Sequence, residues 1–410
     1  MKTVTLQKVY TVVLALLVAL FPFSKALPNI LLPLLVVLFV ADVRNVDFSK
    51  LKQPVVYALY TVMGYLFIKG ALRGSLFSEF SVYSKYITIL VMPVLFAKVT
   101  DYLLIKKVLL AGIVATVVVS IIKSFVYYAA HGNFPFNIGL EVNEILILER
   151  PYAGFYAVAG TLLSLHLIPK MPRYRWLLVA AAGLCVFFIV FIAARMSLIS
   201  LVICLGIYIM FYARMKLFMR LLIAFAGLLL VSGAVFLNKN LYNRLFVDQT
   251  MDTTIDYEPR VVIWQCAYDL LHNPDYNPVF GFPSNKVLEN EYVDCFAGKI
   301  TNNETKRAWF IKVKFNSHNQ FHDYMLAHGF TGLLLLAGFM LMLLYHVRRN
   351  FIYFSIVLSL IFFMAVENIF FRQMGCYIFS IFIALLLINN NQIIDEEDQI
   401  SSYPFFFKRG

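Results

Sequence analysis

Long apolar runs alternate with short polar connections along most of the chain. A helix needs about 17–25 mainly apolar residues to cross the hydrocarbon core of a bilayer. Backbone amides in lipid must pair within their own segment, so such runs predict helices. The runs lie at 8–24, 28–43, 54–71, 82–99, 107–130, 151–169, 175–194, 196–213, 217–237, 323–346, 350–368 and 373–388. The pattern predicts an all-α, polytopic membrane bundle of about twelve transmembrane helices.

One connection is much longer than a helix bundle needs. Residues 1–237 would hold spans one to nine, 238–322 a long loop, 323–388 the last three spans, and 389–410 a tail. Loops of this length are usually functional or disordered. This loop is rich in aromatic residues, and Pro259 precedes a stretch with helical periodicity. We therefore expect the loop before the tenth span to fold as a small helical cap.

The composition supports a membrane protein and argues against a soluble one. The chain is 61% hydrophobic and 14% charged, with a mean hydropathy of +0.77, whereas soluble domains carry about 25% charged residues. The net charge of +12 does not indicate nucleic-acid binding, because the basic residues lie in short loops. Their distribution fits the positive-inside rule. It predicts cytoplasmic termini, a non-cytoplasmic cap and a surface in contact with membrane lipids.

Two histidines lie where the long loop enters the tenth span. Histidine is the side chain whose ordinary pKa is nearest neutrality, so His318 beside Asn319 could hold a proton acceptor near the lipid headgroups. An interfacial histidine without a role is the alternative. His318 and His322 are spaced i, i+4 and could face one metal ion. No glutamate follows the first histidine and no third ligand is evident, so we expect neither a metal nor a cofactor.

Charged residues at span ends form a second signal. They are Arg150, Arg195, Arg260, Glu367 and Arg372. A charge at membrane depth is costly and indicates function by default, and guanidinium groups bind phosphate bidentately. Headgroup snorkelling or an ion pair is the alternative, and it is the reading we adopt for Lys69 and Lys123. Arg195 stands out because the hairpin between its two spans is very short.

The cysteines leave one question open. Cys266 and Cys295 share the long loop, and an oxidising compartment would permit a bridge between them. The sequence does not decide whether it forms. The other three cysteines fall inside predicted spans, where we expect them to pack.

Together these residues resemble the O-antigen ligase and polymerase superfamily. His318 and Asn319, followed by nine residues, Gly329, two residues and Gly332, fit the ligase motif. Arg260 with Trp264 is similar to the start of the family's loop helix, and Arg195 matches the arginine after its central span. Glu367 with Arg372-Gln373-Met374-Gly375 is similar to its last outer turn. His322 departs from the pattern, because the family usually has an apolar residue there.

The resemblance implies a metal-independent glycosyltransferase of the bacterial inner membrane with its active site facing the periplasm. It would move a glycan from undecaprenyl diphosphate to lipid A–core oligosaccharide, with inversion at the anomeric carbon. His318 would be the general base, and Asn319 would orient the imidazole or a sugar. Arg195 and Arg260 would hold the diphosphate. Arg150, Glu367 and Arg372 would line the same cleft.

Three other functions remain open. A polymerase of the same superfamily would move the same donor onto another lipid-linked glycan, and a third enzyme would use protein hydroxyls as acceptors. A flippase or secondary transporter would perform no chemistry. Transporters tend to carry charges and broken helices at the bilayer midplane, whereas the charges here cluster at the outer ends of the spans. That distribution favours an enzyme.

Overall fold

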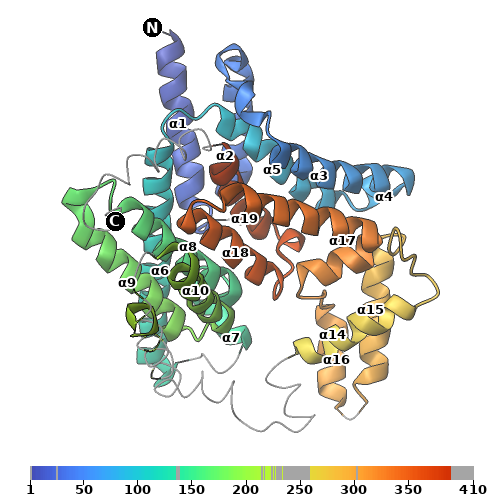
Figure 1. The fold of residues 1–410 in the computed structure, drawn as a ribbon. Coiled ribbons are helices and arrows are strands. Elements are labelled where there is room, and N and C mark those ends of the chain that lie inside the picture. The colour runs from blue at the N-terminus through green and yellow to red at the C-terminus, as the bar shows by residue number, and fades with distance from the viewer. Residues whose placement is uncertain are drawn as a thin grey trace.

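The computed structural model describes residues 2–24, 26–134, 139–213, 259–301 and 303–388, with a few positions between 216 and 233. Over these residues the protein is helical and has no strand (Figure 1). Most of the predicted span 217–237, the start of the cap and the tail 389–410 lie outside the described residues.

Every other predicted span coincides with a helix. These helices are α1 (Lys2–Leu20), α2 (Ala26–Ala41), α3 (Pro54–Leu72), α5 (Phe80–Ala97), α6 (Tyr102–His131), α8 (Arg150–Leu167), α9 (Arg175–Phe191), α10 (Arg195–Ile207), α17 (Gln320–Val347), α18 (Phe351–Met364) and α19 (Gln373–Ile388). Among the described residues, six helical segments are long and apolar enough to cross a membrane, and four more are shorter but apolar. The all-helical membrane class is therefore confirmed, while the count of twelve stays a prediction.

Short helices connect these elements. They are the 3-10 turns η1 (Val43–Asn45), η2 (Phe48–Leu51), η4 (Pro172–Tyr174), η6 (Leu270–His272) and η7 (Ile369–Phe371), the π-turn η5 (Tyr208–Tyr212), and the helices α4 (Ser75–Ser78) and α7 (Gly139–Ile145). Of these, η7 lies in the last turn of the bundle, between α18 and α19.

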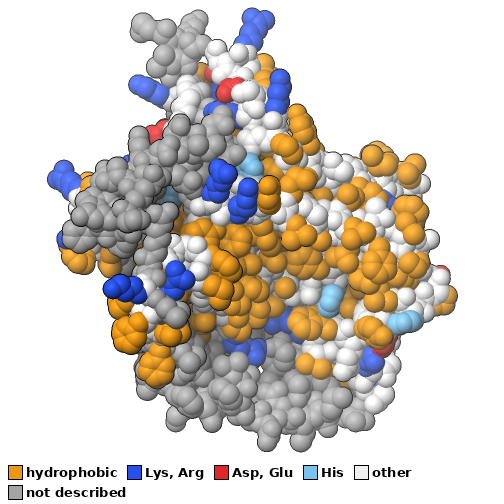
Figure 2. Space-filling model, in the orientation of Figure 1, with side chains coloured by type: hydrophobic (Ala, Val, Ile, Leu, Met, Phe, Trp, Pro, Cys, Tyr) orange, Lys and Arg blue, Asp and Glu red, His pale blue; other side chains and the backbone are white. Residues whose placement is uncertain are grey.

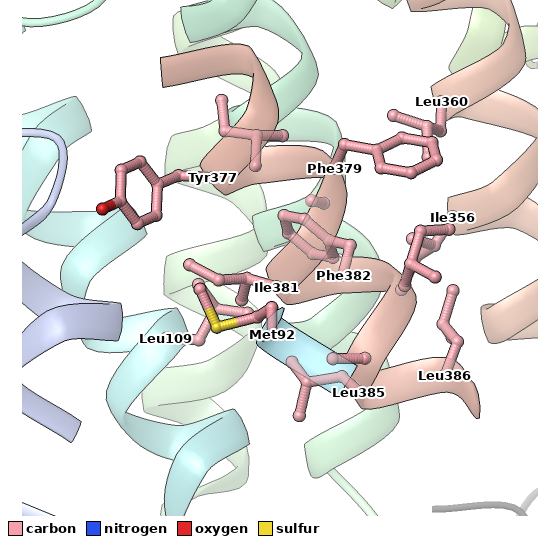
Figure 3. Packing of buried hydrophobic residues seen from close by; sticks show 14 of the residues in the cluster. Met92, Leu109, Ile356, Leu360, Tyr377, Phe379, Ile381, Phe382, Leu385 and Leu386 are labelled. Carbon is pink, nitrogen blue, oxygen red and sulfur yellow. The ribbon is translucent and has the colours of Figure 1, made fainter. Parts of the chain in front are cut away.

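α19 forms the centre of the bundle. Its residues from Gly375 to Ile388 are all buried, as expected for a helix that is apolar on every side. Phe379 and Phe382 pack there with Leu360 of α18 (Figure 3). The outer face of the molecule is instead apolar and exposed, with hydrophobic side chains over much of the visible surface (Figure 2). A buried central helix and an apolar exterior together fit a bundle in lipid.

The cap has a core of its own. It contains α14 (Arg260–Asp269), η6, α15 (Asn285–Lys299) and α16 (Glu304–Val313). Ile263, Phe296 and Phe310 are fully buried between these helices. A disulfide joins Cys266 of α14 to Cys295 of α15 across a Cα–Cα distance of 5.9 Å. The bridge that the sequence left open is thus present, and it fixes α14 against α15.

A turn of the cap, residues 277–282, is hydrogen-bonded into a break in α17. The amide of Phe282 donates to the carbonyl of Leu326 at 2.8 Å, and the amide of Phe330 donates to that of Pro278 at 2.8 Å. Helix geometry fails between these points, where Gly329 has φ 68° and ψ −171°. Non-glycine residues essentially never adopt that conformation. The cap therefore completes the backbone pairing that the broken helix loses.

Close approach explains the glycines of this joint. A Cβ on Gly281 (φ 72°) would overlap the carbonyl oxygen of Leu326, and a Cβ on Gly329 would overlap that of Val279. Gly332 is crowded by the side chain of His328 one turn earlier. Of the two glycines of the sequence motif, Gly329 thus serves the joint between cap and membrane helix, whereas Gly332 allows close packing within α17.

Lys69 corrects one sequence expectation. We expected its ammonium group to snorkel or to pair with a carboxylate. Instead the side chain is buried, and Nζ donates to the carbonyls of Ala327 and, at 3.3 Å, Phe282. Tyr65 donates to the next carbonyl, that of His328, at 2.9 Å. The expectation failed because the break in α17 leaves carbonyls without helical partners, and a buried donor satisfies them.

A second anchor holds the other side of the cap. Glu79, at the start of α5, is buried and accepts hydrogen bonds from the side chain of Asn285 at 2.6 Å and the amide of Lys286 at 3.1 Å. These groups lie in the first turn of α15. A carboxylate is favoured at a helix N-terminus, where amides are unpaired and the helix dipole is positive. The cap is therefore fixed to the bundle at two separate points.

Candidate functional site

His318 lies in a tight connection between the cap and α17. Asn319 is the N-cap of α17, and its side-chain oxygen accepts from the amides of Phe321 at 2.9 Å and His322 at 3.1 Å. The hydroxyl of Ser317 donates to the carbonyl of Asn319 at 2.8 Å. Capping of this kind typically contributes about 1 kcal/mol. The helix start thus fixes the backbone around His318.

The backbone of His318 is strained. Its φ is +43°, in the left-handed region, which costs a non-glycine residue of the order of 1 kcal/mol or more. Its amide donates to the side chain of Asn316 at 3.0 Å, which helps to hold the conformation. Strain of this type gathers at functional sites, where the surrounding structure enforces it. Here it directs the imidazole toward the last turn of the bundle.

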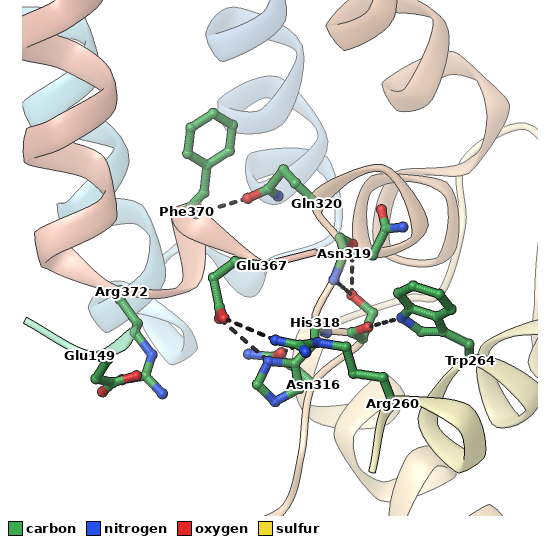
Figure 4. Close-up of polar contacts among 11 residues, drawn as sticks. Glu149, Arg260, Trp264, Asn316, His318, Asn319, Gln320, Glu367, Phe370 and Arg372 are labelled. Carbon is green, nitrogen blue, oxygen red and sulfur yellow. Dashed lines mark hydrogen bonds and ion pairs between the residues drawn. The ribbon is translucent and has the colours of Figure 1, made fainter. Parts of the chain in front are cut away.

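Glu367 meets His318 in that turn. Its Oε1 lies 3.4 Å from Nδ1 of His318, and its side chain is only 3% exposed (Figure 4). The distance is longer than a usual hydrogen bond, but catalytic contacts often tighten only when substrate binds. A carboxylate on one imidazole nitrogen fixes the ring and its tautomer. Glu367 is therefore placed to orient His318.

Arg260 reaches the same carboxylate from the cap. One of its terminal nitrogens lies 4.0 Å from Oε2 of Glu367, and its side chain is 26% exposed. Trp264, one turn later on α14, donates from Nε1 to the carbonyl of Ser317 at 3.0 Å. The cap, the start of α17 and the last turn thus converge on one carboxylate (Figure 4).

The turn that carries Glu367 is itself fixed. The side-chain oxygen of Gln320, in the first turn of α17, accepts from the amide of Phe370 at 2.8 Å. Gly375 allows the following helix to approach closely, because a Cβ there would overlap the carbonyl of Ile369. These contacts tie η7 to the helix that follows His318. His318 and Glu367 are therefore held by parts of one rigid assembly.

The remaining arginines lie on neighbouring helices. Arg195 is the first residue of α10, and the hairpin before it turns through Ala193 with φ 52°. Arg150 begins α8, and Gly154 one turn later lies against Ala194 and the side chain of Ser197 of α10. Because α8 packs against α10 close to their first turns, Arg150 and Arg195 lie at neighbouring helix starts. That the short hairpin fixes Arg195 for a role in the site stays a prediction.

Arg372 forms an ion pair with Glu149, the residue before Arg150 (Figure 4). The contact ties the last turn to the start of α8. The structure thus joins His318, Glu367 and Arg260 directly, links Arg372 to α8, and relates Arg150 to Arg195 through helix packing.

Comparison with known families identifies part of the chain. Residues 180–337 match the model of the O-antigen ligase family. The match supports a relation to the O-antigen ligase superfamily for this part of the chain. The matched segment runs from α9 through the cap into α17 and includes Arg195, Arg260 and His318. No curated protein matches the chain.

The ring of His322 lies against α14 of the cap. It packs edge-on against Trp264, with centroids 5.8 Å apart, whereas the ring of His318 lies beside Phe315 and Glu367. Among the residues that the structure describes, no three His, Cys, Asp or Glu side chains are grouped to bind a metal. The two histidines therefore have different surroundings despite their helical spacing.

The sequence alone did not show two features of the candidate site. The sequence prediction grouped Glu367 with the diphosphate-binding residues, and no spacing along the chain could show its contact with His318. It gave Asn319 a role in orienting the imidazole or a sugar, whereas the side-chain oxygen caps α17. This second feature was readable, because asparagine before a helical run is a common N-cap signal.

Proposed function

We propose that this protein is an O-antigen ligase, a glycosyltransferase that joins a glycan from undecaprenyl diphosphate to a sugar hydroxyl of lipid A–core oligosaccharide. The observation that carries the proposal is the convergence of His318, Glu367 and Arg260 at the junction of cap and bundle. A base, its orienting carboxylate and a guanidinium group are the parts that this reaction needs.

His318 acts as the general base. With the proton of the imidazole on Nδ1, that nitrogen donates to Glu367 and leaves Nε2 to accept a proton from the acceptor hydroxyl. The hydroxyl oxygen attacks the anomeric carbon as the bond to the diphosphate oxygen breaks. Undecaprenyl diphosphate leaves with that electron pair, and inversion follows from attack opposite the leaving group. Such a base typically contributes about 10²–10⁴ in rate.

The arginines stabilise the leaving group. Diphosphate oxygens gain negative charge as the glycosidic bond breaks, and guanidinium donors already in place stabilise that charge without reorganisation. Arg260 would approach from the cap, and Arg195 with Arg150 from the starts of α10 and α8. Bidentate binding gives these residues geometric specificity as well as charge.

The other site residues position this machinery. Glu367 orients His318 and draws Arg260 toward it, a role that suits a carboxylate better than contact with an anionic diphosphate. Arg372, paired with Glu149, holds the last turn against α8. Asn319 caps the helix that follows the base. In this proposal the protein needs no metal or cofactor, because arginines supply the charge that a cation would otherwise provide.

The proposal includes a membrane orientation. The site faces the periplasm, both ends of the chain face the cytoplasm, and residues 238–322 form the cap between a nine-span unit and a three-span unit. Glycan donor and lipid acceptor are both anchored in the same outer leaflet. A site at the foot of a cap would meet both substrates there.

Deletion of the gene in its host tests the function. Loss of every glycan-capped lipopolysaccharide band with accumulation of polymeric lipid-linked glycan is expected for a ligase. Lipopolysaccharide capped with a single repeat would instead indicate a polymerase, and a normal ladder would refute both. Purified protein should transfer glycan between the two lipids in detergent, which a flippase would not do.

A further inference from the structure

α14 has an exposed face that continues beyond the residues used above. The helix buries Val262, Ile263, Cys266 and Ala267 against the cap core. Its opposite face carries Arg260, Trp264 and Tyr268 at spacings of one helical turn, and His272 follows in η6. Trp264 is 37% exposed and Tyr268 is 65% exposed, so aromatic surface follows the face away from the site.

The first of these rings is tied to the segment that carries His318. The indole of Trp264 donates to the carbonyl of Ser317, the residue before His318 (Figure 4), and packs edge-on against His322. The rings of Tyr268 and His272 contact each other with centroids 5.3 Å apart. Successive turns of an α-helix rise by about 5.4 Å, so Trp264 and Tyr268, one turn apart on α14, both expose ring surface along this face.

The same face is polar enough to exclude a position in lipid. Gln265 and Asp269 are exposed beside the aromatic side chains. Asp269 pairs with Lys299 of α15 at 2.7 Å, and their side chains are 48% and 35% exposed. An ion pair in contact with water belongs outside the hydrocarbon layer. Exposed rings flanked by amide and carboxylate groups match a sugar, which has an apolar ring face and polar hydroxyl edges.

We propose that Trp264, Tyr268 and His272 form a glycan-binding track that leads from His318 along the outer face of α14 and stacks pyranose rings of a substrate. The track deepens the proposed function and rests on it, because it assumes a glycan substrate at His318. The glycan comes from the donor or from the core of the acceptor, which share this chemistry. Stacking on rings would bind successive units without requiring one sugar sequence.

Transfer kinetics on the full-length protein in nanodiscs test the track. The variants are Tyr268→Ala, Tyr268→Phe, which keeps the ring, and the control Tyr345→Ala, an exposed tyrosine of α17 outside the cap. One arm varies the donor glycan from one repeat to many with a fixed acceptor. The other arm varies the acceptor core from truncated to full length with a fixed donor.

Tyr268→Ala should raise KM roughly three- to tenfold, as expected for loss of an aromatic contact, and leave kcat unchanged. This increase in KM should occur in only one of the two arms, and there only with the longer glycan. The arm in which it occurs shows whether the track binds the donor glycan or the acceptor core. Tyr268→Phe and Tyr345→Ala should behave as the wild type. If Tyr268→Ala raised KM equally for long and short glycans in both arms, or not at all, the proposed track would be refuted. A change that follows the lipid composition of the nanodisc would indicate membrane contact instead, and would also overturn it.

Failure of the proposed function would look different. A wild-type protein that transfers no glycan would refute the ligase, and the track would then be judged by binding alone. The probe is a lipid-free oligosaccharide of several repeats, followed by saturation-transfer NMR. Weaker binding to Tyr268→Ala than to Tyr268→Phe would support the track, and equal binding would refute it.

Discussion

Glu367 contacts Nδ1 of His318 at 3.4 Å, although the two residues lie at the ends of different membrane helices. The contact predicts that the carboxylate of Glu367 positions His318. Removing the negative charge of Glu367 tests this role. Glu367→Gln should insert normally but lower kcat by at least roughly tenfold, with an upper limit near the 10⁴-fold effect of removing the carboxylate from a catalytic histidine. Glu367→Asp should recover part of the loss. Normal turnover by the glutamine variant would contradict the assignment.

Substitution of His318 separates enzyme, metal site and transporter. His318→Ala should fold and lose about 10²–10⁴ in transfer rate, and wild-type activity should persist in EDTA. His322→Ala should be much milder, because one base suffices. A zinc site would instead make both variants severe and chelation inactivating. Full activity of well-folded His318→Ala would leave arginine electrostatics as the main catalytic device.

The arginine assignments depend on geometry as well as charge. Arg195→Lys and Arg260→Lys keep a positive charge but lose bidentate contact with phosphate. We expect both to lose most of their transfer activity at saturating acceptor, measured with the lipid-linked donor. Lys123→Arg, a change at an exposed position outside the site, is the matched control. If both lysine variants turn over normally, a positive charge alone is sufficient at these positions, and bidentate binding of the diphosphate is refuted.

The disulfide between Cys266 and Cys295 should stabilise the cap. Replacing both cysteines with serine should lower cap stability by about 2–4 kcal/mol. Limited proteolysis should then cut α14 or α15 at lower temperature, and transfer should fall because Arg260 loses its fixed position. The buried Cys185→Ser serves as a control for loss of a thiol. Unchanged proteolysis and activity would show that the bridge is dispensable.

The topology of the cap can be tested with reporters. A reporter fused within 285–300 should be active only outside the cytoplasm, and one fused after Asn391 only inside. Asn391 lies outside the described residues, so this result depends on the charge pattern alone. Reporters that place cap and tail on the same side would refute the proposed orientation.

Much of the fold could be predicted because lipid leaves the backbone few choices. Apolar runs had to become helices, and their positions agree with the helices that the structure describes. The break at Gly329 was not predicted, because it depends on the cap turn replacing lost hydrogen bonds. Lys69 is buried because it donates to carbonyls at that break. Its burial therefore could not be predicted from the sequence either.

The candidate site was predictable in its parts but not in its connections. His318, Arg195 and Arg260 occupy unusual places along the chain, so their types and positions were informative. Whether Glu367 binds substrate or orients His318 depends on a contact between distant segments. Local signals along the chain do not encode such a contact.

The hydrogen bonds between the 277–282 turn and the break in α17 impose an order on biogenesis. The cap leaves the ribosome before α17 is synthesised, so the turn has no partner until that helix enters the bilayer. A chain that stalls earlier would carry Arg260 and Trp264 on an unfinished cap with no base beside them. The proposed site would be completed later still, because Glu367 follows α18 and meets His318 only when that helix is also in place.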